Sequence, residues 1–413
     1  MSKINTERLW QRLMDMAAIG ATAGGGVKRL ALTETDRQGR TLFMDWCTSA
    51  GLHLRKDTMG NLFARRKGLD PQRKAVLIGS HLDSQPSGGK YDGTLGVLAA
   101  LEVIETLNDL NIATQAPLEI VSWTNEEGAR FSPAMIGSGV FAGKFPLAYA
   151  YQQKDAAGTS LEQALQHIDQ LGQDVVQAAE FAAALELHIE QGPVLEAAAT
   201  TIGVVTAVQG IRWYRLKIIG HETHAGPCPM EMRQDPIRGL SELLPQLYKL
   251  QLSLPLSQEE RTAARITVGE LQAYPGSINT VPAEVHLSID IRHPDSSILD
   301  QLGQALEQVV RQLASSSQLD YKLEAVWHSP PQSFDPACIK AVEQACQDLK
   351  LSHQHIVSGA GHDAVYLAKV IPTSMIFIPC RDGLSHNEAE HIEQEHAFAG
   401  TEVLLQAVLQ LAN

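Results

Sequence analysis

Five side chains of the kinds that bind transition metals are spread along this chain, most of them just after a segment typical of a buried strand. They are His81, Asp92, Glu127, His188 and His386. Imidazole nitrogens and carboxylate oxygens are ligands that Zn²⁺ or Mn²⁺ takes in proteins, and five of them suffice for two ions when one carboxylate bridges. The set therefore predicts a dinuclear metal site.

Glu126 directly precedes the proposed ligand Glu127. Adjacent carboxylates repel each other and are costly to bury unless a cation neutralises them, and two exposed surface acids are not expected right after the apolar run 118–123. A metal that binds one carboxylate leaves the other free to take a proton from an activated water, which is the chemistry of a hydrolase. Asp83 is predicted to accept the far imidazole N–H of His81 and so to fix its tautomer.

Each of these residues also has a plainer interpretation. A histidine at a strand end can be a hydrogen-bonded structural residue, Asp92 could only cap a helix, and Asp83 could be a turn residue beside Ser84. The metal site is favoured because His81, Glu127 and the other candidates occupy equivalent positions. In an α/β sheet, ligand sites gather at the carboxyl ends of the strands.

Composition narrows the class of protein. The chain has 413 residues, which is too long for one typical core and favours two domains. Its formal net charge of −14 argues against binding to nucleic-acid phosphates, and no apolar run is long enough to span a membrane. The first residues lack the apolar stretch of a signal peptide, and the five scattered cysteines are typical of free thiols in a reducing compartment. We therefore expect a cytoplasmic protein with neither nucleic-acid nor membrane partners.

Strand and helix signals alternate over residues 1–210. Residues 75–79 and 118–123 are typical of buried strands, with a helix over 93–107 between them. The same alternation resumes after Phe334, with a helix over 339–349 and a strand over 374–379. This pattern predicts an α/β domain whose mixed sheet has helices on both faces. The glycine cluster at 20–28 is predicted to be a plain loop, because no Ser or Thr follows Lys28 as a phosphate loop requires.

The segment that lies between these two parts has a different pattern of strand and helix signals. Strand signals cover 213–219, 265–271, 284–292 and 321–326, and helix signals cover 236–250 and 297–313. The resulting order, βαββαβ, is that of a split-βαβ sandwich. We therefore expect residues 211–328 to form an α+β domain inserted into a larger domain made of 1–210 and 329–413.

Five motifs, in this order, carry a resemblance to a known family. They are Gly-Ser-His-Leu-Asp-Ser (79–84), Gly-Gly-Lys-Tyr-Asp-Gly (88–93), Asn-Glu-Glu-Gly-Ala-Arg-Phe (125–131), Leu-His-Ile-Glu-Gln-Gly (187–192) and Ser-Gly-Ala-Gly-His-Asp-Ala (358–364). Over nearly its whole length the chain resembles the amidase/hydantoinase/carbamoylase branch of the dinuclear zinc exopeptidase and aminoacylase family. That branch includes N-carbamoyl-L-amino acid hydrolases, allantoate amidohydrolases and β-ureidopropionases.

The resemblance implies two divalent metal ions (Zn, or Mn, Co or Ni), with the five ligands named above, Asp92 bridging and Glu126 as the base. It implies that the inserted domain is a lid that also forms a homodimer. It marks further residues as substrate contacts: Gln209, His224, Asn279, Arg292, and the backbone at Gly359 or Gly361.

Two of the lid residues make physical sense from the sequence. Arg292 ends a strand whose alternate residues are apolar, so it projects from the opposite face and could grip a substrate carboxylate. The alternative is an ion pair with Asp290 or Asp295 inside the domain. His224 could donate to a developing oxyanion, or could be a turn histidine. The segment 224–230 departs from the family by having Pro227 and Cys228 where many relatives have two threonines.

The expected reaction is hydrolysis of the ureido C–N bond of an N-carbamoyl-L-amino acid to the amino acid, ammonia and CO₂. Residues 125–135 and 379–386 look more like those of carbamoylases than of allantoate enzymes, with allantoate or ureidopropionate as the alternative substrate. A different class, a non-catalytic metal-binding scaffold, is disfavoured because metal binding alone has no use for the spare carboxylate of Glu126.

Overall fold

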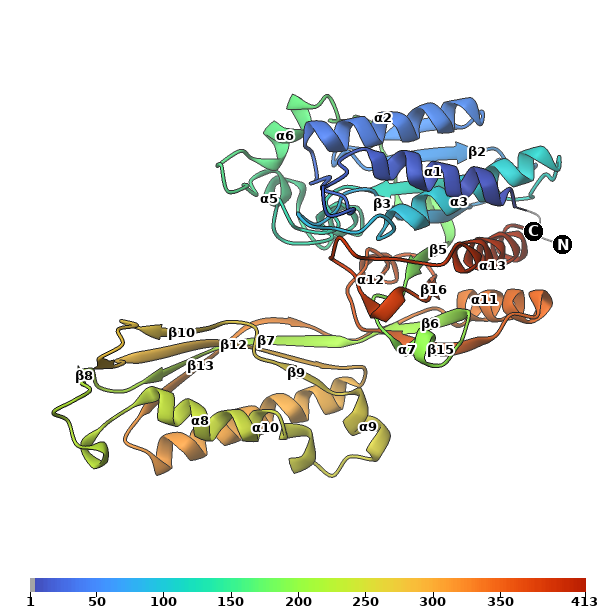
Figure 1. The fold of residues 1–413 in the computed structure, drawn as a ribbon. Coiled ribbons are helices and arrows are strands. Elements are labelled where there is room, and N and C mark those ends of the chain that lie inside the picture. The colour runs from blue at the N-terminus through green and yellow to red at the C-terminus, as the bar shows by residue number, and fades with distance from the viewer. Residues whose placement is uncertain (1–3) are drawn as a thin grey trace. The chain divides into compact units, whose positions relative to one another are not determined.

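A computed structural model describes residues 4–413 and divides into two units (Figure 1). One comprises the chain up to Ala207 together with Ser333–Asn413, and the other is Val208–Gln332. Both divisions fall within a few residues of the boundaries expected from the sequence. We call the first the metal unit, after the metal ligands expected in it from the sequence, and the second the inserted unit.

The metal unit is built on a mixed sheet with strand order β1-β2-β4-β3-β5-β16-β6-β14, and β15 pairs with β6. Its strands are β1 (His53–Lys56), β2 (Leu62–Arg66), β3 (Ala75–His81), β4 (Leu118–Trp123), β5 (Phe181–Ile189), β6 (Ile202–Val208), β14 (Gln332–Ser333), β15 (His353–Ser358) and β16 (Thr373–Ile378). The pairs β4–β3, β3–β5 and β5–β16 are parallel, whereas β2–β4 and β16–β6 are antiparallel. The central strands therefore end at one edge of the sheet.

Both faces of this sheet are buried. Alternate residues of β3 point to opposite sides, so Val76 and Ile78 join one apolar core while Ala75 and Leu77 join another. The first core includes α1 (Thr6–Ala18), α2 (Glu34–Ser49), α3 (Thr94–Asp109), α11 (Pro336–Leu349) and α13 (Gln394–Ala412). The second side includes α4 (Ile136–Phe141) and α12 (Ala364–Leu367), with α5 (Leu147–Tyr151), α6 (Leu161–His167) and α7 (Val194–Ala197) elsewhere in the unit. The α/β architecture with helices on both faces is thus the one expected.

The inserted unit has the predicted order of elements. Its antiparallel sheet runs β10-β12-β7-β13, with β9 also paired to β12, and α8 and α10 pack on it (Figure 1). The bounds are β7 (Gly210–Ile219), α8 (Pro236–Leu247), β9 (Arg265–Thr267), β10 (Leu271–Tyr274), β12 (Glu284–His293), α10 (Ser296–Ser316) and β13 (Asp320–Ser329). The short elements are β8 (Thr223–His224), α9 (Gln258–Ala263) and β11 (Thr280–Val281).

The prediction of one continuous strand over 265–271 is wrong, because the chain forms two strands there, β9 and β10, with a break between them. Both pieces pair with β12. At the break the backbone N–H of Glu270 donates to the Ser288 hydroxyl at 2.9 Å. A side chain thus supplies the acceptor where the strand ladder is interrupted, and Gly269 lies at this point.

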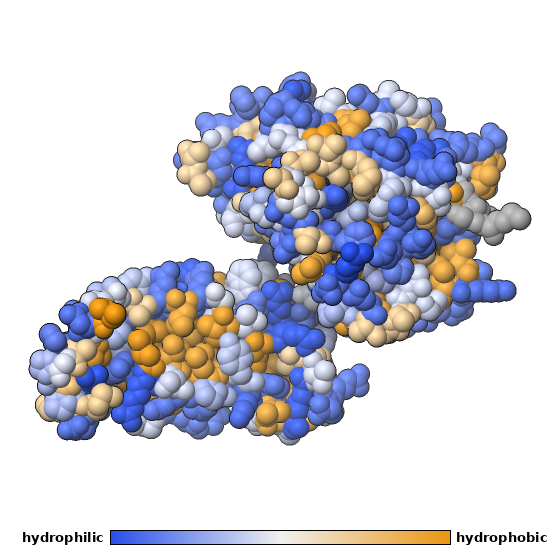
Figure 2. Space-filling view, viewed as in Figure 1, coloured by the Kyte–Doolittle hydropathy of each residue, from blue (hydrophilic) through white to orange (hydrophobic). Residues whose placement is uncertain are grey.

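The sheet of the inserted unit is apolar on one face. Val285, Leu287, Ile289 and Ile291 of β12 are buried in a core shared with α8 and α10. On β7 and the edge strand β13, Trp213 and Trp327 are partly exposed, and their ring centroids lie 4.8 Å apart. Apolar side chains also gather at the surface of this unit between the strands and α8 (Figure 2).

Among the described residues, no helix has both the length and the apolar character needed to cross a membrane. The five cysteines are all unpaired, and all but Cys228 are buried.

Candidate metal centre

The predicted ligands come from four neighbouring parallel strands and the segments that follow them. His81 is the last residue of β3 and lies opposite Trp123, the last residue of β4, while His188 of β5 lies opposite Phe377 of β16. Because these strands are parallel, their carboxyl ends meet at one edge of the sheet. The turn after β4 carries Glu127, and the loop after β16 carries His386.

Asp92 lies between the histidines. Its Oδ1 is 3.2 Å from His188 Nε2 and 3.6 Å from His81 Nε2. Its Oδ2 is 3.6 Å from His386 Nε2, and His386 Nε2 is 3.1 Å from Glu127 Oε2. The five residues therefore form two possible ligand groups, His81–Asp92–His188 and Asp92–Glu127–His386, each with its ligand atoms within 4.8 Å of one another. Asp92 belongs to both groups, as a bridging carboxylate must.

The chemistry of this donor set fits divalent cations. Within residues 4–413 the ion-pair partners of Asp92, Glu126 and Glu127 are all histidines. Asp92 and Glu126 are buried, and buried carboxylates without a cation nearby are strongly disfavoured. Two divalent ions held by the five residues would supply the missing positive charge.

Asp92 does not cap a helix. The residue at the N-cap of α3 is Gly93, and no side chain caps that helix. Instead, Asp92 Oδ2 accepts hydrogen bonds from the Ser385 hydroxyl at 2.6 Å and from Gln191 Nε2 at 2.8 Å. These two donors orient the shared carboxylate. Neither was expected from the sequence, although they lie one residue before His386 and three residues after His188.

The predicted contact of Asp83 with His81 needs a correction. The acceptor for His81 Nδ1 is the backbone carbonyl of Asp83, at 2.9 Å, while the carboxylate lies 3.9 Å away. The carboxylate accepts the backbone N–H groups of Glu126 at 3.2 Å and Glu127 at 3.3 Å. In the segment after β3 the carbonyl of Asp83 therefore points to the His81 imidazole, while the Asp83 side chain points to the neighbouring turn after β4. Asp83 thus positions one histidine and both glutamates.

Glu126 lies beside the first ligand group without belonging to it. Its Oε2 is 3.5 Å from His81 Nε2. Burial raises the pKa of Glu126 well above its usual value against the opposing effect of His81, and the Asp363 and Glu127 carboxylates raise it further. A carboxyl group whose pKa is raised is better suited to accepting and returning a proton than an ordinary, exposed carboxylate.

The turn that carries Glu126 is held by local hydrogen bonds. Asn125 has a left-handed backbone, with φ of 58°, which asparagine tolerates better than most residues. Its side-chain amide donates to the carbonyl of Phe131 at 2.8 Å, and the carbonyl of Glu126 accepts from the N–H of Met135 at 2.7 Å. The segment 125–135 therefore contributes, together with Asp83, to the conformation that directs two adjacent carboxylates to the site.

Further buried polar residues surround the site and have no role in the sequence analysis. His362 packs edge-on against His188 with ring centroids 4.6 Å apart, and its Nε2 lies 3.0 Å from the Ser358 hydroxyl. Glu186 accepts a 2.6 Å hydrogen bond from Ser80 and forms a possible ligand group with His188 and His362. The sequence does carry a signal for Glu186, since it lies two residues before His188 and so faces the same side of β5.

The predicted substrate contacts in the inserted unit do not form a single cluster, because Arg292 lies at the other end of β12 from the pair His224 and Asn279. His224 and Asn279 are exposed, and the pairing of β8 with β11 places them close together, with the Ala225 N–H donating to the Asn279 carbonyl at 2.9 Å. Arg292 is half-buried and bonded to Asp290, with an Nη2–Oδ2 distance of 2.8 Å. The intradomain ion pair considered from the sequence is therefore formed. Gln209 follows β6 and is half-buried.

The remaining predicted contacts belong to the metal unit. Gly359 is exposed and Gly361 half-buried in the loop after β15, next to the buried His362. A side chain at Gly361 would come within 3.2 Å of the Met135 methyl group. This loop leads directly into His362, the histidine that packs on His188.

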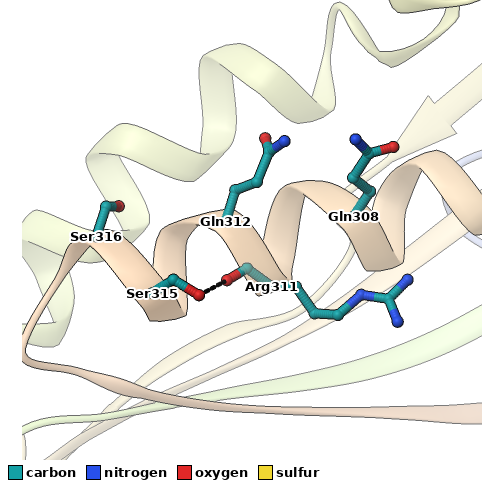
Figure 3. Close-up of a pocket in the computed structure, with 5 residues that line it drawn as sticks. All are labelled: Gln308, Arg311, Gln312, Ser315 and Ser316. Carbon is teal, nitrogen blue, oxygen red and sulfur yellow. Dashed lines mark hydrogen bonds between the residues drawn. The ribbon is translucent and has the colours of Figure 1, made fainter.

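A surface hollow elsewhere is a poor candidate for chemistry. It lies on α10 of the inserted unit and is lined by Gln308, Arg311, Gln312, Ser315 and Ser316 (Figure 3). None of these five side chains is a ligand type preferred by Zn²⁺ or Mn²⁺. The cluster of acids and imidazoles at the sheet edge, not the shape of the surface, identifies the candidate site.

Comparison with known proteins identifies the family of the chain. Residues 77–410 match the peptidase family M20/M25/M40. An N-carbamoyl-L-amino-acid amidohydrolase of Rhizobium meliloti is 45% identical over 99% of this chain and 97% of its own length. An allantoate amidohydrolase of Bacillus subtilis is 33% identical over 96% and 95%. The crystal structure of an amidase of the hydantoinase/carbamoylase family from Burkholderia multivorans has a TM-score of 0.94 at 48% identity, covering 99% of this chain and 98% of that one. The chain therefore belongs to the peptidase family M20/M25/M40.

Proposed function

We propose that this protein is a metal-dependent amidohydrolase that cleaves the ureido C–N bond of N-carbamoyl-L-amino acids. The observation that carries the proposal is the pair of ligand groups sharing Asp92, with the carboxylate of Glu126, which belongs to neither group, only 3.5 Å from His81. The names of the relatives add the substrate class, since an N-carbamoyl-L-amino-acid amidohydrolase is 45% identical over nearly the whole chain.

The five ligands would hold two divalent ions, Zn²⁺ or else Mn²⁺, Co²⁺ or Ni²⁺. When bound, these ions would supply Lewis acidity that activates a water molecule and polarises the scissile carbonyl group. Asp83 keeps the turn at 126–127 in place through its two backbone hydrogen bonds. Ser385 and Gln191 keep the Asp92 carboxylate in its orientation.

Glu126 is the group that moves the proton. Its carboxylate accepts a proton from the water that attacks the carbamoyl carbon and then donates it to the leaving nitrogen, so that the C–N bond breaks with the amine neutral. The products are the free amino acid and carbamate, which decays to ammonia and CO₂. His224 donates a hydrogen bond to the oxyanion that develops on the carbamoyl oxygen.

The inserted unit recognises the rest of the substrate in this proposal. Arg292 binds the substrate carboxylate, for which it would exchange its present partner Asp290, while Gln209, Asn279 and the backbone at Gly359 or Gly361 contact the ureido group. A planar guanidinium suits a carboxylate because it donates two parallel hydrogen bonds.

The inserted unit also forms a homodimer in this proposal. The edge strand β13 has ten residues, and Val326 and Trp327 on it are exposed by 47% and 38%. A long exposed strand with apolar side chains is a pairing surface, and a second copy of the same chain would cover it.

A second candidate substrate is allantoate, because an allantoate amidohydrolase of Bacillus subtilis is 33% identical over 96% of the chain. The deciding experiment measures ammonia released from N-carbamoyl-L-amino acids, N-carbamoyl-D-amino acids, ureidopropionate and allantoate. The enzyme is freed of metal by chelation and then reloaded with Mn²⁺ or Zn²⁺. We expect turnover of the N-carbamoyl-L-amino acids only after reloading. Full activity in protein shown to be metal-free would contradict the proposal. Turnover of allantoate alone would identify allantoate, and not an N-carbamoyl-L-amino acid, as the substrate.

A further inference from the structure

We infer that Glu390 is a positioning residue that determines where the shared ligand Asp92 lies. The inference rests on the two-metal site proposed above and adds to it a residue that binds no metal. Glu390 is only 4% exposed. Its Oε1 accepts the backbone N–H of Tyr91 at 2.8 Å and of Asp92 itself at 3.1 Å, across almost 300 residues of sequence.

Gly89 explains how the Glu390 carboxyl group fits there. A Cβ atom on Gly89 would lie 2.0 Å from the carboxyl carbon of Glu390, which no real contact allows. The backbone of Gly89 is outside the left-handed region, so a glycine is needed here for space and not for conformation. The second glycine of the Gly-Gly-Lys-Tyr-Asp-Gly motif is thus the counterpart of a glutamate near the other end of the chain.

The segment 385–390 contacts both the side chain and the backbone of Asp92. Ser385 donates to the Asp92 side chain at 2.6 Å, and His386 Nε2 lies 3.6 Å from the same carboxylate oxygen. Glu390 binds the backbone of that residue. Without Glu390, the loop 89–92 keeps the side-chain contact but loses the anchor of its main chain. Because Asp92 belongs to both ligand groups, a shift of its backbone should weaken both metal sites together.

The test titrates metal-free protein with Mn²⁺ and determines the stoichiometry and the dissociation constants, with folding checked by circular dichroism. Glu390→Ala should weaken both sites by about 10- to 100-fold, the usual effect of removing a group that orients a ligand. Glu390→Gln keeps an oxygen that can accept from both N–H groups, so it should retain most of the affinity.

A matched control separates an effect on the position of Asp92 from a general effect on the stability of the fold. Glu402 on α13 is also buried and accepts a backbone N–H, that of Ile4 at 2.9 Å, and this hydrogen bond joins two segments outside the candidate site. Glu402→Ala should lower the melting temperature of the metal-free protein and leave the Mn²⁺ affinity within about twofold of wild type. Equal loss of affinity in both variants would overturn the inference, because it would reflect general destabilisation.

A double mutant tests the contact itself. Gly89→Ala should displace the Glu390 carboxylate and weaken metal binding as Glu390→Ala does. The double variant should bind Mn²⁺ no more weakly than Glu390→Ala alone, since the new methyl group at position 89 then has no carboxylate to displace. Additive losses would contradict the inference.

The two proposals fail in different ways. If the wild type does not bind two equivalents of Mn²⁺, the proposed function fails. If it binds two, and a folded Glu390→Ala binds both as tightly as wild type, only the role of Glu390 is wrong.

Discussion

At the scale of single residues, the proposal depends most on Glu126. Glu126→Gln removes the group that accepts the proton but leaves Glu127 and the histidines in place. Since general acid–base catalysis contributes roughly 10²–10⁴-fold, we expect kcat to fall by at least 100-fold with metal content unchanged. Ammonia release and metal analysis of the same preparation check this.

The neighbouring substitution is the control. Glu127→Gln should lose metal, because Glu127 is one of the three members of the second ligand group. A loss of less than about tenfold for Glu126→Gln, with full metal content, would assign the base to another residue.

Arg292 allows a prediction about substrate recognition. Arg292→Lys keeps the positive charge but loses the planar pair of hydrogen bonds, so KM should rise for acid substrates with a smaller change in kcat. The measurement compares an N-carbamoyl amino acid with its amide in both proteins. The wild type should strongly prefer the acid, and the variant should do so much less. An unchanged preference would mean that Arg292 serves only in its ion pair with Asp290.

At the scale of elements, the site depends on two turns held together by one carboxylate. Asp83 after β3 accepts the two N–H groups of the turn after β4. Asp83→Ala leaves His81 with its backbone partner but frees that turn, so we expect the site containing Glu127 to lose metal first and turnover to fall. Metal content after dialysis and ammonia release check this. An unaltered metal stoichiometry with full activity would show that the turn holds without Asp83.

At the scale of the whole molecule, the cluster of carboxylates around the histidines predicts how metal binding varies with pH. Burial disfavours the charged imidazole of His81, but the Glu126 and Asp92 carboxylates outweigh it and raise the pKa of His81 well above its usual value. The hydrogen bond with Glu127 likewise raises the pKa of His386.

An imidazole must be neutral to bind metal, so protons compete below the raised pKa values. Metal affinity should therefore fall as the pH decreases, and the fall should begin at a higher pH than an ordinary histidine would give. Mn²⁺ titrations across this pH range, with folding checked at each point, measure it. A constant affinity down to the usual histidine pKa would contradict the prediction.

The proposed homodimer leads to a prediction about shared sites. If His224 serves the metal site of the partner, then mixing Glu126→Gln with His224→Ala under subunit exchange should restore activity. Half of the sites in a mixed dimer then carry both lesions and the other half carry neither. A mixture that stays inactive although exchange is demonstrated would place His224 at the site of its own chain.

Much of this protein could be predicted from its sequence. The apolar runs at β3, β4 and β16 are short and end at residues of other character, so the strands and the sheet edge followed from local patterns. The five candidate ligands were proposed from their types and from their places after these strands, and the structure brings their side chains together. The order of elements in the inserted unit was visible for the same reason.

Other features were decided only by tertiary structure. The break between β9 and β10 depends on the Ser288 hydroxyl of a neighbouring strand. Whether the carbonyl or the carboxylate of Asp83 meets His81 depends on how one turn curls against another. The contact of Glu390 with Gly89 joins segments that only the folded chain brings together. A sequence records which groups are present and the periodicity of their surroundings, whereas the atoms that meet across long separations are determined by the packing of the whole core.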